Sequence, residues 1–324
     1  MANIVTYSPA FTLVPTYECF NRCQYCNFRV DPGKDTWLTL TEAEATLRSL
    51  QSRSSPIIEI LILSGEVHPR SVRRGEWFSH IYQLCELALA LGFLPHTNVG
   101  PLSWQEMAHL KTVNASMGLM LEQLTPSLLT TVHRHAPSKR PELRLQQLEW
   151  AGELQIPFTT GLLLGIGENS SDRRATLSAI AQCHARFGHI QEVILQPYSP
   201  GNQEALKEAG FSLTELVELV AIARQILPAD IAIQIPPNLV HEPQILIACL
   251  EAGARDLGGI GPWDEVNPDY PHPVHTMLRN RLEEAGWRLE CRLPVYPQYE
   301  DWLPATIGQQ VRVWRERISI ATTC

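Results

Sequence analysis

Three cysteines near the N-terminus are the residues of this chain whose types and spacing point most directly to chemistry. Cys19, Cys23 and Cys26 lie in the run ECFNRCQYCNF with the spacing Cys-x-x-x-Cys-x-x-Cys. Thiolates are the usual ligands of iron–sulfur clusters, and a [4Fe–4S] cluster takes four ligands. Because the run supplies three ligands and no evident fourth, one iron would be left open. The spacing therefore predicts a [4Fe–4S] cluster that binds and activates a small molecule.

A zinc site and three unrelated thiols are the alternatives for these cysteines. Zinc sites usually combine two closely spaced pairs of Cys or His, and this chain has no second pair. The other five cysteines are not spaced as ligands. Cys85 and Cys249 lie in apolar helical runs and are predicted to be buried core residues. Cys183, Cys291 and Cys324 have no partner at metal-ligand spacing, and we expect structural roles for them.

The cysteine spacing resembles that of the radical S-adenosylmethionine (SAM) enzymes. The resemblance implies that SAM binds the open iron through its amino and carboxylate groups. It also implies that an electron from the cluster splits SAM into methionine and a 5′-deoxyadenosyl radical, which abstracts hydrogen from a substrate. Tyr25 matches the aromatic residue that this family commonly places against the adenine. A tyrosine that only packs within its own loop is the alternative.

The composition is that of a globular enzyme. The chain has 324 residues, of which 44% are hydrophobic and 19% charged, and its net charge is −8. No run of Lys and Arg is longer than two residues, so we expect no nucleic-acid partner. The N-terminus lacks the pattern of a signal peptide, and no apolar stretch is long enough to span a membrane. These features predict a cytoplasmic protein without a membrane partner, whose cysteines are reduced.

Strand-like and helix-like segments alternate along the chain. This alternation predicts parallel βα units and an α/β fold, a (β/α) barrel of TIM type with eight strands. The expected strands are residues 11–17, 57–65, 93–98, 115–121, 158–165, 192–198, 230–236 and 255–259. We expect residues 1–286 to form the barrel domain and residues 287–324 to form a C-terminal extension packed on it. Thr39 or Thr41, with Glu44, is predicted to cap the first helix.

The segment after the second predicted strand, Ser64-Gly65-Glu66, resembles the Gly-Gly-Glu segment of the radical SAM family, whose backbone carbonyls and Glu hold the SAM ammonium. Glycine allows a close approach of the backbone, and a carboxylate pairs with a cation. Ser64 stands where the family has its first glycine, so the match is partial. A turn that only ends the strand is the alternative.

The fifth predicted strand ends in a second glycine-rich pattern. Gly161, Leu163, Gly165 and Glu168 match the Gly-x-apolar-x-Gly-x-x-Glu pattern that the radical SAM family carries on its fifth strand. The resemblance implies that this strand passes beneath the adenine, where the glycines leave room and the apolar side chain forms a stacking surface. Taken alone, a glycine-rich strand end indicates only tight packing, which is the alternative.

Two basic residues lie between the fourth and fifth predicted strands. Lys139 and Arg144 could bind the SAM carboxylate, as an arginine in this region does in related enzymes. We choose Arg144 because a planar guanidinium donates paired hydrogen bonds to a carboxylate; a solvated surface charge is the alternative. His133 and His135 are two residues apart and would not share a helix face, so we expect both at the surface or in a loop.

Three polar residues at or near strand ends are candidates for catalysis, and the sequence does not choose among them. Glu122 ends the fourth predicted strand, where it could hydrogen-bond a ribose or the substrate, or interact with a helix N-terminus. Tyr198 ends the sixth predicted strand, and Asp256 lies in the eighth. Glu122 and Tyr198 lie at the carboxyl ends of their strands, where barrels of this type place their chemistry, and Asp256 begins a polar, turn-rich segment.

A narrower resemblance extends over nearly the whole chain. The segments RCQYCNF, LILSGE, ASMGLMLEQLTP, PFTTGLLLGIGE, IPPNL and EAGARDLGGIGP are similar to those of the first subunit of FO synthase, where FO is 7,8-didemethyl-8-hydroxy-5-deazariboflavin. The resemblance implies that a partner subunit joins a tyrosine-derived hydroxybenzyl group to a ribityl-diaminouracil. This chain would then abstract hydrogen from the adduct, close the third ring and release ammonia, with an external electron donor for its cluster. After Gln196 the chain has Pro197, Tyr198 and Ser199, whereas related members often have Asn and basic residues there.

Two other functions remain open from the sequence. A sibling radical SAM enzyme, such as the partner subunit or a futalosine enzyme of the menaquinone pathway, would share the barrel and the cysteine loop. A non-catalytic iron–sulfur or zinc protein would use the cysteines for electron transfer or for structure. The segments 64–66 and 161–168 argue against the second of these functions, because an electron carrier needs no SAM site.

Overall fold

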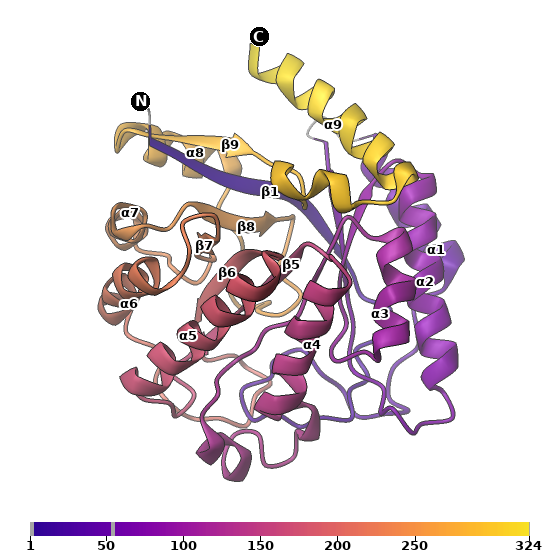
Figure 1. The fold of residues 1–324 in the computed structure, drawn as a ribbon, viewed down its shortest axis with the longest axis horizontal. Coiled ribbons are helices and arrows are strands. Elements are labelled where there is room, and N and C mark those ends of the chain that lie inside the picture. The colour runs from indigo at the N-terminus through magenta and orange to yellow at the C-terminus, as the bar shows by residue number, and fades with distance from the viewer. Residues whose placement is uncertain (1–2, 53–55, 324) are drawn as a thin grey trace.

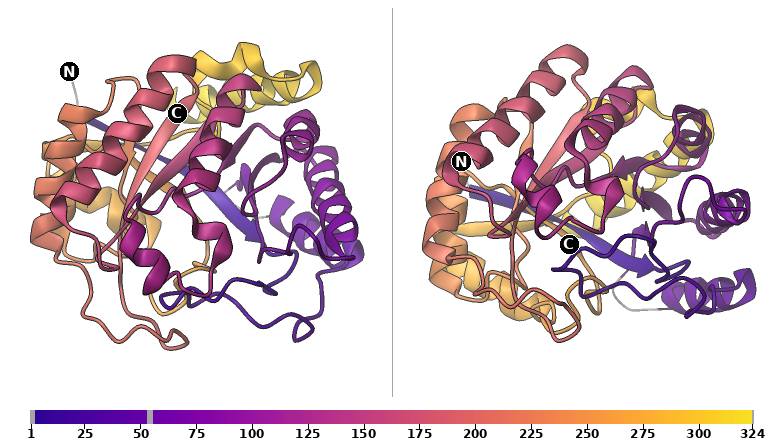
Figure 2. Two further views of the ribbon diagram at one scale, coloured as in Figure 1. Left: turned by 60° about the horizontal axis from the view of Figure 1, so that its bottom comes forward. Right: turned by 90° about the horizontal axis from the view of Figure 1, so that it is seen from below.

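Eight parallel strands close into a barrel that helices surround (Figure 1, Figure 2). The computed structural model describes residues 3–52 and 56–323, so Cys324 lies outside the described residues. β1 pairs with both β2 and β8, which closes the barrel and confirms the predicted TIM-type fold. The strands are β1 (Asn3–Leu13), β2 (Glu59–Leu63), β3 (Leu94–Asn98), β4 (Ser116–Gly118), β5 (Phe158–Leu164), β6 (Ile190–Pro197), β7 (Ala232–Gln234) and β8 (Asp256–Ile260).

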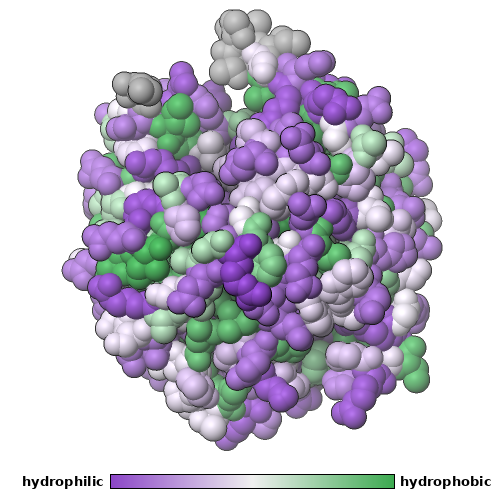
Figure 3. Space-filling view, in the orientation of Figure 1, coloured by the Kyte–Doolittle hydropathy of each residue, from purple (hydrophilic) through white to green (hydrophobic). Residues whose placement is uncertain are grey.

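The helices that follow the strands bury one apolar side against the barrel and expose the other. In α2, for example, Trp77, Ile81 and Leu84 recur at helical spacing and are buried. The face of the molecule in Figure 3 is accordingly mostly polar, with apolar residues in separate patches. Cys85 and Cys249 are buried, as predicted. The helices are α1 (Leu40–Gln51), α2 (Arg74–Ala90), α3 (Trp104–Leu110), α4 (Pro141–Glu153), α5 (Ser170–Phe187), α6 (Leu213–Ile226), α7 (Pro243–Ala252) and α8 (His275–Glu284).

Short 3-10 helices complete the described elements, at Lys111–Val113, Pro126–Thr130, Pro137–Lys139 and Pro297–Trp302. Two of them, Pro126–Thr130 and Pro137–Lys139, lie in the long connection between β4 and α4. Within the described part of the chain, no helix is both long enough and apolar enough to cross a membrane.

β1 begins and ends earlier than the sequence predicts. The apolar run at residues 11–17 predicts the strand there, whereas β1 spans Asn3–Leu13. Its first half gains a partner from the far end of the chain, because Asn3–Tyr7 pair in parallel with β9 (Trp287–Cys291). Residues 14–17 instead begin the loop that carries the cysteines. A local apolar pattern carries no information about such a distant strand, which explains the shift.

The cap of α1 is formed by Thr39, one of the two predicted residues. The Thr39 hydroxyl accepts a hydrogen bond from the N–H of Glu42, and the Glu42 carboxylate accepts one from the N–H of Thr39, which makes a complete capping box. The prediction that Glu44 takes part in the box is wrong, because the helix begins before Thr41. Glu44 instead pairs with Arg48 one turn further along the helix.

The C-terminal segment packs against the amino-terminal end of the barrel. After β9 the chain forms the 3-10 helix Pro297–Trp302 and α9 (Ala305–Thr323), drawn in yellow in Figure 1. Its apolar side chains form a cluster with residues that begin or precede β2, β3 and β4. The barrel contributes Ile58, Leu94 and Ala115 to this cluster, and the C-terminal segment contributes Leu293, Val295, Tyr299, Ile307, Val311 and Trp314.

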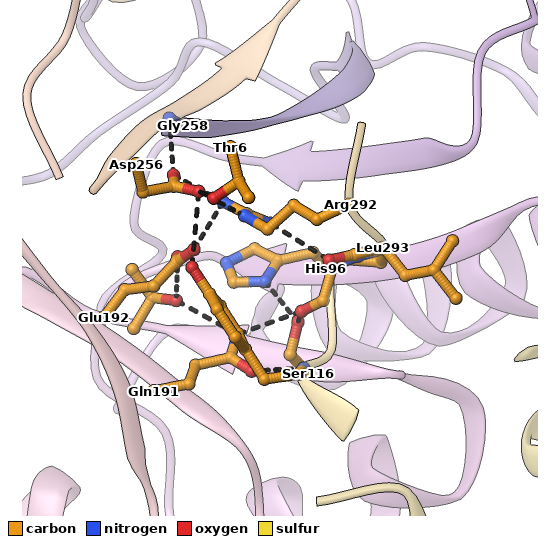
Figure 4. A network of polar contacts seen from close by, with 12 residues as sticks. Thr6, His96, Ser116, Gln191, Glu192, Asp256, Gly258, Arg292 and Leu293 are labelled. Carbon is orange, nitrogen blue, oxygen red and sulfur yellow. Dashed lines mark hydrogen bonds and ion pairs between the residues drawn. The ribbon is translucent and has the colours of Figure 1, made fainter. Parts of the chain in front are cut away.

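Arg292, which follows β9, brings a positive charge to two buried carboxylates inside the barrel (Figure 4). Its Nε lies 2.6 Å from Oδ2 of Asp256, and the guanidinium also pairs with Glu192. Asp256 further accepts hydrogen bonds from the hydroxyl of Thr6 and the N–H of Gly258. Burial raises the pKa of Glu192 above its ordinary value, an effect that the charge of Arg292 opposes. These contacts tie β1, β6 and β8 to the C-terminal segment.

Replacing Arg292 with methionine should destabilise the fold strongly. The substitution leaves the carboxylates of Asp256 and Glu192 buried without their cation, which typically costs about 3–5 kcal/mol of the free energy of unfolding. Arg288→Met is the matched control, because Arg288 pairs with Glu290 at the surface, where an ion pair contributes less than about 1 kcal/mol. Chemical denaturation measures both variants, and equal losses would contradict this account of the network.

Candidate functional site

A cavity of about 380 Å³ lies at the carboxyl ends of the strands and extends into the barrel. Residues from each of the strands β1–β8 line it, together with residues from the loops that follow several of them. Active sites of (β/α) barrels lie at this end because the loops there converge on the barrel axis. The cavity is therefore the candidate site.

The cysteine loop, residues 14–39 between β1 and α1, borders this cavity. It is held by the loops that follow β2 and β4. The N–H of Phe20 donates to the carbonyl of Glu66 at 3.1 Å, and the N–H of Arg22 donates to the carbonyl of His135 at 2.7 Å. All three cysteines of the loop line the cavity. The structure thus brings the three predicted thiols to one side of one cavity.

The thiols of the cysteine loop would need a cation in order to ionise. Among the described residues, no group of three or more His, Cys, Asp and Glu side chains is placed to hold one metal ion. Burial raises the pKa of Cys19 to about 11 and that of Cys23 to about 12. Both would stay protonated at neutral pH without a cation, and iron would supply that charge.

Ser64, Gly65 and Glu66 follow β2 and all line the cavity. The backbone of Gly65 passes directly against the cysteine loop, because a Cβ at this position would lie 2.1 Å from the carbonyl oxygen of Glu18. The hydroxyl of Ser64 accepts from Nε1 of Trp77 at 3.0 Å and donates to the carbonyl of Gly65 at 2.8 Å. Ser64 therefore stabilises the turn at the position where the family has a glycine.

Glu66 is held in place by hydrogen bonds from three directions. Nδ2 of Asn21 donates to one oxygen at 2.8 Å, and the hydroxyl of Ser138 donates to the same oxygen. Nη2 of Arg144 lies 3.3 Å from the other oxygen. Arg144 is 1% exposed and also donates to the carbonyls of Ser138, at 3.0 Å, and Met120. The guanidinium thus joins the loops after β2 and β4 beneath the cysteine loop.

Glu122 and Lys139 form a second buried ion pair in the wall of the cavity. Nζ of Lys139 lies 2.5 Å from Oε1 of Glu122. Although burial by itself raises the pKa of Glu122, the charges of Lys139 and Arg144 hold it below its ordinary value. The backbone of Glu122 has a φ of 65°, a left-handed conformation that is strained in a residue other than glycine. Strain of this kind is common where a side chain is held for function.

Tyr25 packs against His133 in the connection between β4 and α4. The Tyr25 hydroxyl lies 3.0 Å from Nε2 of His133. Both His133 and His135 lie in a loop, as predicted, but His133 is only 3% exposed there, whereas His135 is exposed. Burial and the charge of Lys139 lower the pKa of His133 to about 4, so the ring is neutral at pH 7. His133 lies in the connection between β4 and α4, where Leu128 and Val132 pack into the same cluster as Tyr25.

The glycine-rich end of β5 contributes one side chain to the cavity. Leu163 lines the cavity, whereas Gly161 does not. Gly161 is packed tightly inside the barrel, because a Cβ there would lie 2.4 Å from the carbonyl oxygen of Ile194 and 2.9 Å from the sulfur of Met120. This glycine thus lets β5 approach its neighbours closely.

Gly165 and Glu168 lie outside the cavity lining, in the turn from β5 to α5. The Glu168 carboxylate accepts the N–H of Gly165 at 2.8 Å and the N–H of Ile166 at 2.9 Å. It also pairs with Arg173 at 2.7 Å. In this structure Glu168 therefore organises the turn after β5, and through that turn the end of the strand.

Two of the three candidate catalytic residues line the cavity. Glu122 and Tyr198 do, and the hydroxyl of Tyr198 donates to Glu204. Asp256 does not, and its carboxylate is engaged by Arg292.

The sequence analysis missed a set of polar residues deeper in the barrel. They are Glu59, His96, Thr159, Glu192 and Arg292, and all of them line the cavity. A signal was present, because Glu59 and Glu192 are charged residues within strands that are otherwise uncharged.

The comparisons with known proteins agree with the cysteine pattern and the barrel. Residues 13–180 match the radical SAM superfamily. The FeFe-hydrogenase maturase HydG from Carboxydothermus hydrogenoformans superposes with a TM-score of 0.73 at 17% identity, covering 96% of this chain and 77% of that one. Methylornithine synthase superposes with a TM-score of 0.65 at 14% identity, covering 93% and 86%. These two structures support the fold alone. The chain belongs to the radical SAM superfamily, which implies a [4Fe–4S] cluster and SAM.

Closer relatives in sequence define the family within it. The 7,8-didemethyl-8-hydroxy-5-deazariboflavin synthase of Trichormus variabilis is 66% identical over 315 residues, which cover 97% of this chain and 92% of that protein. The protein of the same name in Trichodesmium erythraeum is 63% identical over 320 residues, 99% of this chain and 100% of that protein. The chain belongs to the family of 7,8-didemethyl-8-hydroxy-5-deazariboflavin synthases, as its sequence motifs predict.

Gly65→Ala should displace the cysteine loop. The added methyl group would overlap the carbonyl of Glu18, so the loop must move, at a typical cost of about 1–3 kcal/mol. We expect a lower melting temperature and less iron per chain after anaerobic reconstitution. Gly75→Ala is the control, because nothing lies within 4 Å of a Cβ added there. Normal iron content and stability in the Gly65→Ala variant would refute the close approach as a constraint.

Proposed function

We propose that this chain catalyses the ring closure that forms 7,8-didemethyl-8-hydroxy-5-deazariboflavin. The substrate would be the adduct of a hydroxybenzyl group with a ribityl-diaminouracil, and ammonia would leave, so the reaction is that of a carbon–nitrogen lyase. The observation that carries the proposal is 66% identity over 97% of the chain to a protein named for this product. The cysteine-lined cavity of the barrel supports it, because radical chemistry needs an enclosed site for both cofactor and substrate.

We infer the cofactors from the three thiols at the mouth of the cavity. Cys19, Cys23 and Cys26 would hold the [4Fe–4S] cluster, and when bound with SAM this cluster supplies the 5′-deoxyadenosyl radical that abstracts hydrogen. The chain itself fixes the thiols on a loop supported by Gly65 and encloses the reacting groups. The proposal includes two partners outside this chain, a second FO synthase subunit that makes the adduct and a donor of electrons to the cluster.

The charged residues beside the cysteine loop would bind the amino acid end of SAM. Glu66 and the turn at Ser64 and Gly65 would accept the ammonium, and Arg144 would act on the carboxylate or position Glu66. Because Arg144 already donates to Glu66 and to two carbonyls, we favour positioning as its larger contribution. Lys139 is the other cation within reach of the carboxylate.

The aromatic and glycine-rich residues would bind the adenosine end. Tyr25 and Leu163 line the cavity, and would offer an aromatic ring and an apolar side chain to the adenine. Gly161, Gly165 and Glu168 would act indirectly, by shaping the end of β5. Catalytic roles for Glu122, Tyr198 and Asp256 remain predictions. The position of Glu122 and Tyr198 in the cavity lining supports their roles, whereas Asp256 has no such support.

Arg144→Lys should weaken SAM binding roughly 10-fold or more, because a lysine ammonium cannot donate to both carbonyls and to Glu66 at once. Equilibrium dialysis with the cluster-loaded protein measures the affinity, and the cluster absorbance separates this effect from loss of iron. Arg140→Lys is the control, because Arg140 is exposed. Unchanged SAM affinity in the Arg144→Lys variant would remove this residue from the site.

The direct test of the proposed function is anaerobic turnover. The cluster-loaded protein is mixed with SAM, a reductant and the adduct, and both deazaflavin fluorescence and 5′-deoxyadenosine are expected. Cys23→Ala should abolish both products, whereas Cys183→Ala, at a buried cysteine of α5, should keep both. 5′-Deoxyadenosine without the deazaflavin would assign the substrate to a sibling enzyme, and absence of both products would contradict the proposal.

A further inference from the structure

The deepest part of the cavity is polar, which is unusual inside a barrel. We call the residues Glu59, His96, Glu192 and Arg292 the polar floor. All four line the cavity, and each is less than 10% exposed. Glu59 is the first residue of β2, and Glu192 lies near the start of β6, so both are far from the carboxyl ends where the cysteine loop lies. Figure 4 shows Arg292, Glu192 and His96 converging inside the barrel.

Glu59 is the member of the polar floor that lacks a partner. Among the described residues, no donor hydrogen-bonds to its carboxylate and no cation lies within ion-pair distance. The nearby Arg292 is already engaged, since Asp256, Glu192 and the carbonyl of Leu293 take up its donors. A buried carboxylate without a partner is costly, because it loses water and gains nothing in return. Such a group at the bottom of a cavity indicates a ligand that supplies the donors.

His96 presents a second acceptor to the same space. Ser116 donates its hydroxyl hydrogen to the carbonyl of Pro294 at 2.6 Å, so it accepts the hydrogen of His96 Nδ1 at 2.7 Å. Burial lowers the pKa of His96, and the neutral ring therefore carries a lone pair on Nε2. Nε2 lies next to Gly118, at 2.9 Å from where a Cβ would be, and Gly118 lines the cavity. The lone pair thus belongs to a side chain that lines the same cavity as Glu59.

The middle of the cavity has different polar groups. Asn98, Gln196 and Gln234 lie near the carboxyl ends of β3, β6 and β7 and line the cavity. None of the three has a side-chain hydrogen bond to another described residue. Amides both donate and accept, so they complement the alternating carbonyl and N–H groups of a pyrimidinedione ring. The floor beneath them, by contrast, offers mainly acceptors.

The three parts of the adduct differ in how they fit such a floor. The pyrimidinedione alternates carbonyl oxygens with N–H groups, so a floor of acceptors would repel its carbonyls, whereas the amides above the floor match both kinds of group. The hydroxybenzyl group carries a single hydroxyl on an apolar ring. The ribityl chain carries hydroxyls on successive carbons, and each hydroxyl can donate to a carboxylate or to an imidazole nitrogen. The ribityl chain is therefore the part that satisfies Glu59 and His96 together.

We propose that Glu59 and His96, at the floor of the barrel, bind the ribityl chain of the substrate and so direct its hydroxybenzyl end toward the cysteine loop. This inference deepens the proposed function and rests on it. It makes the polyhydroxy chain a determinant of specificity, held by hydrogen bonds to a buried charge. A site built to bind hydroxyls rejects analogues that lack them, because its own polar groups are then left without partners.

The test compares two deazaflavins that differ only in this chain. The probes are 7,8-didemethyl-8-hydroxy-5-deazariboflavin and its analogue with an ethyl group in place of ribityl, and fluorescence anisotropy measures their binding to the cluster-loaded protein. We expect the unmodified protein to prefer the ribityl compound. Glu59→Met should lower that preference roughly 10- to 100-fold, the range for loss of hydrogen bonds to a charged group. The affinity for the ethyl analogue should not fall.

The controls separate binding from folding. Glu153→Met removes an exposed carboxylate from α4 and should leave the preference as it is. Because Glu59 has no partner among the described residues, its replacement should not lower the melting temperature, and Glu59→Gln, which keeps an acceptor oxygen, should give a smaller loss. A Glu59→Met variant that keeps the full preference for the ribityl compound would overturn the inference.

Turnover distinguishes failure of this inference from failure of the proposed function. A protein that makes the deazaflavin but whose Glu59→Met variant keeps the ribityl preference refutes the inference alone. A protein that shows the Glu59-dependent preference yet makes no deazaflavin from the adduct refutes the proposed reaction, while the polyol site stands.

Discussion

The buried charge of Arg292 is the interaction on which the interior of the barrel depends. One guanidinium pairs with both Asp256 and Glu192 and so stabilises two carboxylates inside the barrel. That guanidinium comes from the segment after β9, so the strands close around a charge that the far end of the chain supplies. A third carboxylate, Glu59, shares this space without a cation of its own among the described residues. The paired charges of the interior are thus compatible with a stable fold, and the carboxylate of Glu59 can still accept hydrogen bonds from a ligand.

The mouth of the cavity differs from the interior, because its paired carboxylates and cations are equal in number. Two carboxylates, Glu66 and Glu122, alternate there with two cations, Arg144 and Lys139, and the pairs are joined by hydrogen bonds. The charges balance, so the region is stable without a ligand. In the proposed function, a zwitterion such as the amino acid part of SAM would insert between them by exchanging one set of ion pairs for another. Little charge reorganisation is then needed on binding, which is the advantage of preorganised sites.

The barrel and the cysteine site could be predicted from sequence because both depend on patterns within short segments of the chain. Apolar runs, helical spacing and the spacing of Cys19, Cys23 and Cys26 are each contained in short segments. The start of β1 could not be predicted, because it depends on pairing with β9 at the other end of the chain. The burial of His133 within its loop could not be predicted for the same reason, because it depends on the packing of that loop against Tyr25. The division of the chain at residue 286 into a barrel domain and a C-terminal extension stays a prediction. β9, which follows this position, shares the sheet of the barrel.

Between the charged mouth and the polar floor, apolar side chains share the cavity wall with uncharged amides. Leu61, Leu119, Ile194 and Leu257 line this middle region together with the three amides. In the proposed reaction, the two rings that become joined would lie here, with the hydroxybenzyl ring against the apolar side chains. A radical in such a region would meet few polar groups that could donate a hydrogen atom or admit water, and excluded water also limits side reactions. The separation of charge to the two ends of the cavity would then serve the proposed reaction, because it would bind both ends of the contents and leave the reacting atoms away from water.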